Sequence, residues 1–462
     1  MLKQYGHDGE RDEKMAQSYT ALTTGRVPGQ LIRYAVPVVL TSLMQALYNL
    51  VDMLIVSRML GPAGASAVNN SSQAMLVLTQ IAIGLSNGGN VLIGQYFGAG
   101  DERRRQETTG SFFSLFALLG LLFSVLACAF SRSFLVFMGA PALEEAAAYL
   151  GISTLGLFFI FGYNALASAL RAVGNSRAPM RFVMISTGLN VLLDLLFVGP
   201  FGWGTAGAAA ATVFSQGLAF LLALFYLLRA GNLFSFCRGN LRMRRKYILL
   251  IFKVGVPCAV QMTVAGISWL TVTYLINRYG VVYSAGNGFA VKIKDLSMMF
   301  ITAMGTAASS MIAQNLGAGL YERAREILYT AMKLAAASAV VMTLLIELTA
   351  PLLIGIFTPD PEVIAAGALN LRIEVLGQVF YAIFISYHAL MIGAGHTWCV
   401  FGSSFANCIL FRVVLAVSFE HFFGIVGVFA ACAIAPSISV PIGMLYTHSN
   451  RWRRSLVEEE QM

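Results

Sequence analysis

Long apolar segments separated by short polar breaks run through most of the chain. An α-helix rises 1.5 Å per residue, so about 20 apolar residues cross the ~30 Å hydrocarbon core of a bilayer. The segments lack the alternation typical of transmembrane strands, which must also close into a barrel to satisfy their backbone. The pattern predicts an all-α integral membrane protein with twelve transmembrane helices, at residues 31–57, 64–93, 110–131, 147–170, 180–199, 205–229, 249–277, 284–313, 330–357, 364–392, 398–419 and 424–447.

Composition and charge support this class. Hydrophobic residues make up 57% of the chain and charged residues only 11%, whereas soluble domains carry roughly a quarter of charged residues. The net charge of +9 comes from arginines and lysines that concentrate in alternate loops, such as 103–105, 242–246 and 451–454. By the positive-inside rule these loops and both termini face the cytoplasm, so the basic charge reports orientation and not a nucleic-acid partner.

Two halves of the chain repeat each other. The loop "GQYFGAGDERRR" is followed 219 residues later by "AQNLGAGLYERA", and "YAVPVVL" around Pro37 matches "KVGVPCAV" around Pro257. Each half holds six spans, an even number, so the halves enter from the same side and form a parallel repeat. We therefore expect two pseudo-symmetric six-helix lobes at 28–229 and 247–447, a cytoplasmic linker at 230–246, and cytoplasmic tails at 1–27 and 448–462.

Two acidic residues lie inside predicted spans of the first half. Asp52 and Asp194 fall at similar depths in the first and fifth spans, and an ionisable residue inside the membrane is costly enough to suggest function. We expect both to face a hydrated cavity; the alternative is that Asp52 pairs with Arg58 and Asp194 packs against backbone donors. The polar residues that extend this cavity along helix faces are Gln45, Tyr48, Asn69, Gln73, Asn190, Thr212 and Gln216.

The second half has a different set of polar residues. Its first span has no acid, and Gln261 is its strongest polar group. Lys292 and Asp295 are spaced as neighbours on one helix face, which predicts an internal ion pair, with a second ion or substrate site as the rival interpretation. Glu374 is expected to pair with Arg372, because an unpaired charge in this position would be costly.

The proline-bearing first span with an aspartate in its outer half, the "GAGDERR" loop, "LNVLLDLLF" in the fifth span and the 6+6 plan resemble the multidrug and toxic compound extrusion (MATE) family. The resemblance covers residues 28–447 and is greater to the DinF-like branch than to the NorM-like branch, whose span 7 carries a glutamate. It implies efflux of organic, often cationic compounds in exchange for H+ or Na+. It also implies an ion-coupling set of Asp52, Tyr149, Asn164, Asn190, Asp194 and Thr212. Ala167, where some relatives have an amide, weakens a metal-coordinating interpretation.

We therefore predict a secondary active antiporter of the cell (plasma or inner) membrane, and no enzyme. It would export small organic cations by alternating access, with Pro37 as a hinge in the first span. We expect a monomer in contact with membrane lipid, without a cofactor or a structural metal, because no Cys or His spacing suits one. The alternatives are a flippase for lipid-linked saccharides with a related bundle, or a membrane-embedded enzyme. The sequence shows few arginines for the former and no catalytic set for the latter.

Overall fold

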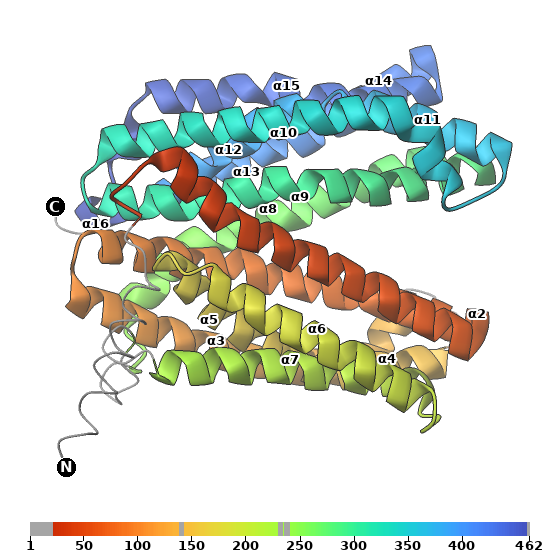
Figure 1. The fold of residues 1–462 in the computed structure, drawn as a ribbon, viewed down its shortest axis with the longest axis horizontal. Helices are drawn as coiled ribbons and strands as arrows, with labels where there is room; N and C mark the ends of the chain where they lie inside the picture. Colours follow the sequence, from red (N-terminus) through yellow and green to blue (C-terminus); the bar gives the residue numbers. More distant parts are fainter. Residues whose placement is uncertain (1–21, 138–142, 230–233, 235–240, 460–462) are drawn as a thin grey trace. The chain divides into compact units, whose positions relative to one another are not determined.

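The computed structural model describes residues 22–137, 143–229, 234 and 241–459, and these residues form helices and no strand (Figure 1). Their contacts divide them into two compact units. The first unit comprises residues 40–259, and the second comprises residues 22–39 together with 260–459. The boundary between the units falls inside a helix in both places, between Val39 and Leu40 and between Ala259 and Val260.

The first unit contains most of α2 and the beginning of α8. The helices concerned are α2 (Val27–Gly98), α3 (Glu102–Phe137), α4 (Leu143–Leu155), α5 (Leu157–Ala172), α6 (Arg177–Val198), α7 (Gly204–Arg229) and α8 (Arg245–Asn277). Gly61 interrupts α2 with a φ of 68°, a left-handed conformation that glycine adopts without steric cost. This break separates α2 into two spans, Val27–Gly61 and Ser66–Gly98.

The second unit contains the remainder of α8 and all later helices. These are α9 (Val281–Gly317), α10 (Tyr321–Gly355), α11 (Pro361–Val375), α12 (Gln378–Ala394), α13 (Thr397–Phe405), the π-helix η2 (Ala406–Val413), α14 (Val414–Phe423), α15 (Ile425–His448), the 3-10 helix η3 (Arg451–Arg453) and α16 (Leu456–Glu459). The π-helix lies between α13 and α14, so it interrupts one apolar span, Thr397–Phe423.

The twelve predicted spans are confirmed when each bent helix pair is counted as one span. Ten helices of the described residues are long and apolar enough to cross a membrane, and two further pairs pass the same test together. These pairs, α4 with α5 and α11 with α12, are bent by 40° and 47°. The bends lie within the predicted spans 147–170 and 364–392, so each of these two spans consists of two helix segments.

Close helix packing accompanies both bends, at equivalent positions of the two repeats. Gly156 follows α4, and a Cβ atom there would lie 3.1 Å from Val213 on α7. Gly377 follows α11, and its Cβ would lie 2.4 Å from the carbonyl oxygen of Ala433 on α15. Because real Cβ atoms do not approach a backbone oxygen so closely, Gly377 lets α15 pack directly against the bend.

The repeated "GAG" loops have the same backbone conformation. Gly100 and Gly319 have φ angles of 69° and 71°, which explains why a glycine is used in both loops. The loops differ in how they start the next helix. The Asp101 carboxylate accepts a hydrogen bond from the Arg104 backbone N–H and caps α3, whereas Leu320 before α10 provides no side-chain cap.

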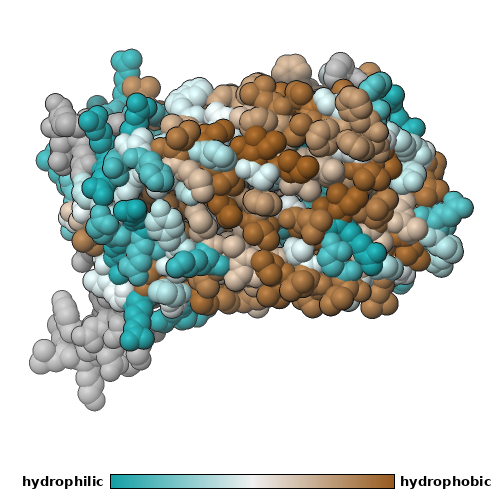
Figure 2. Space-filling model, turned by 90° about the horizontal axis from the view of Figure 1, so that it is seen from above, coloured by the Kyte–Doolittle hydropathy of each residue, from teal (hydrophilic) through white to brown (hydrophobic). Residues whose placement is uncertain are grey.

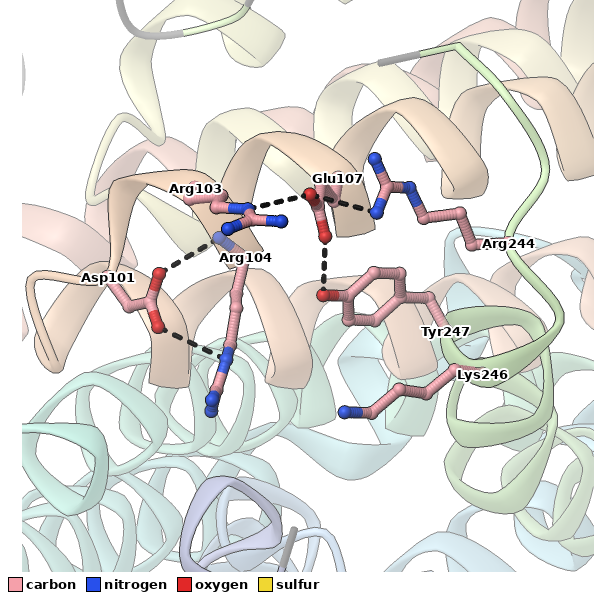
Figure 3. A pocket seen from close by; sticks show the side chains of 7 residues that line it. All are labelled: Asp101, Arg103, Arg104, Glu107, Arg244, Lys246 and Tyr247. Atoms are coloured by element: carbon pink, nitrogen blue, oxygen red, sulfur yellow. Dashed lines mark hydrogen bonds and ion pairs between the residues drawn. The ribbon is translucent and has the colours of Figure 1, made fainter. Parts of the chain in front are cut away.

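Each loop anchors the segment that leads into the first helix of a repeat. In the second unit, the Gln314 side chain accepts a hydrogen bond from the Leu22 backbone N–H, and Arg323 donates one to the Thr24 carbonyl. In the first unit, the buried Glu107 forms an ion pair with Arg244 at 2.9 Å and accepts a hydrogen bond from the Tyr247 hydroxyl. Figure 3 shows the interactions of Glu107 with Arg244 and Tyr247, beside a pocket of about 550 Å³.

Large apolar side chains are exposed along the middle of many helices. On α3, Leu118, Leu121 and Val125 are all at least half exposed, and they share one helix face. Figure 2 shows hydrophobic side chains over the middle of the visible face and hydrophilic side chains gathered toward its ends. Exposed apolar side chains in this number are unfavourable in water, so they form a lipid-facing surface.

The contact at Gly377 gives a testable consequence. Gly377→Ala places a methyl group against the Ala433 carbonyl, and such overpacking costs roughly 1–3 kcal/mol. We expect a lower midpoint of thermal unfolding for the purified protein in detergent. Gly266→Ala on α8 is the matched control, because no atom lies within 4 Å of its Cβ position. A midpoint for Gly377→Ala equal to that of the control would contradict the close packing.

Candidate functional site

Two carboxyl groups meet in the interior of the first unit. Asp52 lies on α2 and is 8% exposed, while Asp194 lies on α6 and is fully buried. Their carboxyl groups are close enough to share a proton in one hydrogen bond. The other interpretation of Asp52, an ion pair with Arg58, is not observed: Arg58 is exposed and forms no ion pair with Asp52 in the part of the chain described.

The polar atoms of this acid pair lack other protein partners. Apart from the two acids themselves, no described residue donates a hydrogen bond to either carboxylate oxygen of Asp194 or to Oδ1 of Asp52. Asn190, one turn before Asp194, is buried, and neither its oxygen nor its nitrogen has a partner there. Buried polar groups are nearly always hydrogen-bonded or neutralised, so this site has the chemistry of one that holds a small cation or a proton.

Two tyrosines surround the acid pair. The hydroxyl groups of Tyr48 on α2 and Thr212 on α7 are 3.1 Å apart and form a hydrogen bond. Tyr48 and Tyr149, from α4, both interact electrostatically with Asp52 and Asp194. Four helices therefore contribute to the site. An apolar cluster that includes Ile55, Val56, Val198 and Ala208 packs beside it and lowers the local polarity.

The remaining predicted polar residues of the first unit are less closely associated with the acid pair. Asn164 is half-buried on α5 and donates a hydrogen bond to the Ile160 carbonyl of its own helix at 2.8 Å. Gln216 is half-buried, whereas Gln45, Asn69 and Gln73 are exposed. Of the residues predicted to line the substrate cavity in this unit, Tyr48 therefore interacts electrostatically with the two carboxylates.

In the second unit, buried charged side chains form a cluster that the sequence did not predict. The ammonium group of Lys294 on α9 forms an ion pair with the carboxylate of Glu374 on α11, and both side chains are almost completely buried. The Lys294 ammonium also lies 3.8 Å from the ring centre of Trp269, and the Arg412 guanidinium lies 4.5 Å from the same ring. Trp269, Lys294, Glu374 and Arg412 are called the cationic cluster below.

The ion pairs expected in this unit were therefore wrong. Lys292 and Asp295 are both exposed and do not pair with each other, although both sequence positions are described. Glu374 pairs with Lys294, while Arg372 pairs with Glu347 at 3.7 Å. Residues two apart on a helix point in different directions, which is why Glu374 can face the interior while Arg372 faces outward. Gln261 is half-buried on α8.

Arg412 is the functional candidate that sequence reasoning missed. It lies in η2 and is 4% exposed. A detectable signal existed, since an arginine inside an apolar run is costly in a membrane and suggests function. The π-helix itself could not be read from the sequence, and such helices occur frequently at functional sites.

Comparisons with known proteins agree with the two-unit fold. A family model described as MatE matches residues 37–196 and again residues 257–418. A probable multidrug resistance protein of Bacillus subtilis, YpnP, is 27% identical and covers 93% of this chain and 97% of its own. A second B. subtilis protein of the same description, YoeA, is 29% identical over 71% of this chain and 73% of its own.

Solved structures share the fold. An outward-facing multidrug resistance MATE family transporter of the MOP superfamily has a TM-score of 0.88 and 23% identity, covering 94% of this chain and 97% of its own. A MATE protein solved in a straight conformation has a TM-score of 0.87, covering 93% of this chain and 97% of its own at 23% identity.

The buried ion pair of the cationic cluster gives a second prediction. Lys294→Met leaves the Glu374 carboxylate buried without its partner, which costs about 3–5 kcal/mol of unfolding free energy. Adding Glu374→Met should recover most of that loss. The measurement is unfolding in mixed micelles titrated with sodium dodecyl sulfate. Arg453→Met, which breaks the exposed Arg453–Glu322 pair, should cost less than about 1 kcal/mol. Equal losses of unfolding free energy in Lys294→Met and Arg453→Met would contradict the stabilising role of the buried pair.

Proposed function

Because the chain belongs to the multidrug and toxic compound extrusion family, described as MatE, we propose that it is a secondary active antiporter. It exports small organic cations in exchange for H+ or Na+ by alternating access. The multidrug resistance names of its relatives support small organic substrates. It acts in the plasma membrane with both termini on the cytoplasmic side, as the distribution of arginines and lysines between its loops supports.

The observation that carries this proposal is the Asp52–Asp194 pair. Two ionised carboxylates at hydrogen-bonding range repel each other strongly in a medium of low polarity. One cation relieves this repulsion: a proton makes one carboxyl group the donor of a hydrogen bond to the other, and Na+ or an organic ammonium group neutralises charge directly. The pair therefore favours the binding of a single cation at a time.

Competition for one site is sufficient to couple two fluxes. If a proton and an organic cation both need the same two carboxylates, binding of one weakens binding of the other by the same factor. A proton entering from outside then favours release of the drug, and drug entering from the cytoplasm favours release of the proton. Tyr48 and Tyr149, which interact with both aspartates, orient the carboxylates, and Thr212 holds the Tyr48 hydroxyl. Asn190 and Asn164 complete the proposed ion-coupling set.

We further propose that Pro37 is the bending point of the first span. The helix continues through Pro37 from Val27 to Gly61, and the boundary between the two units follows two residues later. Proline has no backbone N–H, so one helical hydrogen bond is missing there and bending costs less. Pro257 has the same relation to the boundary in α8.

Substitution of the two acids tests the proposed function. Asp52→Asn and Asp194→Asn keep the side-chain size but remove one negative charge from the pair. We expect each to reduce ethidium efflux from efflux-deficient cells at least tenfold, with protein abundance unchanged. Asp295→Asn, an exposed acid of the second unit, should retain efflux. Efflux by Asp194→Asn at the wild-type rate would refute the coupling role of this pair.

Imposed ion gradients test the exchange itself. In proteoliposomes, an outward-directed drug flux should accelerate with a proton or a sodium gradient applied separately, and the effective gradient identifies the coupling ion. Asp194→Asn should abolish that acceleration. A flux that responds to neither gradient would contradict antiport, whatever the drug.

The proposed hinge makes a kinetic prediction. Pro37→Ala restores a backbone hydrogen bond and stiffens the helix, so we expect a several-fold lower transport rate with unchanged affinity for ethidium. Pro351→Ala, in the interior of α10 and remote in sequence from either unit boundary, is the control and should transport normally. A wild-type rate for Pro37→Ala would exclude this residue as the hinge.

A further inference from the structure

We propose that the cationic cluster of the second unit is the binding site for the carboxylate of transported compounds that carry both a carboxylate and an ammonium group. This inference rests on the proposed export function and assigns a binding site to the anionic group of such compounds. Three features of one unit support it: two buried cations, one buried anion, and guanidinium N–H groups that have no acceptor among the described residues.

The cluster has an excess of positive charge. Lys294 is neutralised by Glu374, whereas Arg412 has no carboxylate of a described residue within ion-pairing distance. The exposed Lys292 and Asp295 lie nearby and balance each other in formal charge, so they leave the excess unchanged. The thiols of Cys408 and Cys432 are also close to Arg412 and add no formal charge.

Arg412 also has unused hydrogen-bonding capacity. Its Nε and Nη1 atoms are buried and have no hydrogen-bond acceptor among the described residues. The ring of Trp269 attracts the guanidinium but accepts no conventional hydrogen bond from it. A buried charge with unpaired N–H groups is strongly unfavourable, and a planar carboxylate matches the guanidinium in both charge and geometry.

Local backbone structure and access suit such a ligand. Arg412 lies in a π-helix, whose extra residue per turn re-aims side chains at functional sites. Tyr381, half-buried on α12, interacts electrostatically with both Arg412 and Asp295. Asp295 is exposed and interacts electrostatically with Lys294 and Glu374, so an exposed charged residue of α9 lies near the cluster.

The assignment of the two charged groups of a ligand to two sites follows from the contrast between the two units. The acid pair of the first unit favours a positively charged group, while the cationic cluster favours a negatively charged one. A compound that carries only an ammonium group gains nothing from Arg412. A compound with an additional carboxylate can form charge-assisted hydrogen bonds with Nε and Nη1. Recognition of the carboxylate should therefore be separable from recognition of the cation.

Binding of a matched pair of ligands tests the inference. The probes are norfloxacin, which carries a carboxylate and an ammonium group, and its ethyl ester, which lacks the carboxylate charge. For the purified full-length protein in detergent, we expect norfloxacin to bind at least tenfold more tightly than the ester. Arg412→Gln should remove this preference by weakening norfloxacin binding at least tenfold. Arg412→Lys, which keeps the charge, should restore part of it.

Two further variants distinguish an anion site from a structural role. Glu374→Gln removes the anion of the cluster, so it should strengthen norfloxacin binding relative to the ester. Arg372→Gln, an exposed arginine that pairs with Glu347, should leave both affinities unchanged. Thermal unfolding of each variant shows whether it is folded. An equal loss of both ligands in Arg412→Gln, or weaker norfloxacin preference in Glu374→Gln, would overturn the inference.

Failure of the inference and failure of the proposed function give different results. If wild-type protein does not transport ethidium, the proposed antiport is wrong irrespective of Arg412. If ethidium is transported and Asp194→Asn abolishes this, but Arg412→Gln still prefers norfloxacin over the ester, only the anion site is refuted.

Discussion

A charged side chain inside a membrane-spanning helix is stable only where an opposite charge, hydrogen bonds or water compensate it. The two units meet this constraint in different ways. In the first unit, no basic residue among those described pairs with Asp52 or Asp194, and under the proposed function a cation compensates their charge. In the second unit, Lys294 supplies the counter-charge to Glu374 internally, and Arg412 carries the charge that remains. The chemistry of each unit follows from the sign of its uncompensated charge.

The repeat preserves backbone geometry and varies the buried charges. Asn175 bonds to Tyr226 in the first unit, and His396 bonds to Tyr446 at the equivalent positions of the second. Helix packing constrains the backbone conformation of both repeats in the same way. The charge of a buried side chain depends only on which residues surround it, so it can differ between the repeats. One duplicated scaffold can therefore hold an acidic site in one unit and a basic site in the other.

The sequence predicted the fold well because span length and apolar composition report directly on the thickness of the bilayer. It also placed Asp52 and Asp194 at the same depth. It did not predict the bends at Gly156 and Gly377, since both glycines have ordinary helical backbone angles and act through the close approach of another helix. The Lys294–Glu374 pair was missed because these residues are 80 positions apart and become neighbours only through helix packing.

The positions of the unit boundaries restrict how the protein can be divided. Because the boundaries lie within α2 and α8 and not in the linker at 230–246, residues 22–39 pack with the second repeat and residues 241–259 with the first. A gene split between the two repeats would produce fragments that each carry the wrong leading segment. A fragment of residues 40–259 would carry the first unit as one continuous stretch, whereas the second unit would need residues 22–39 joined to residues 260–459, as in a circularly permuted chain.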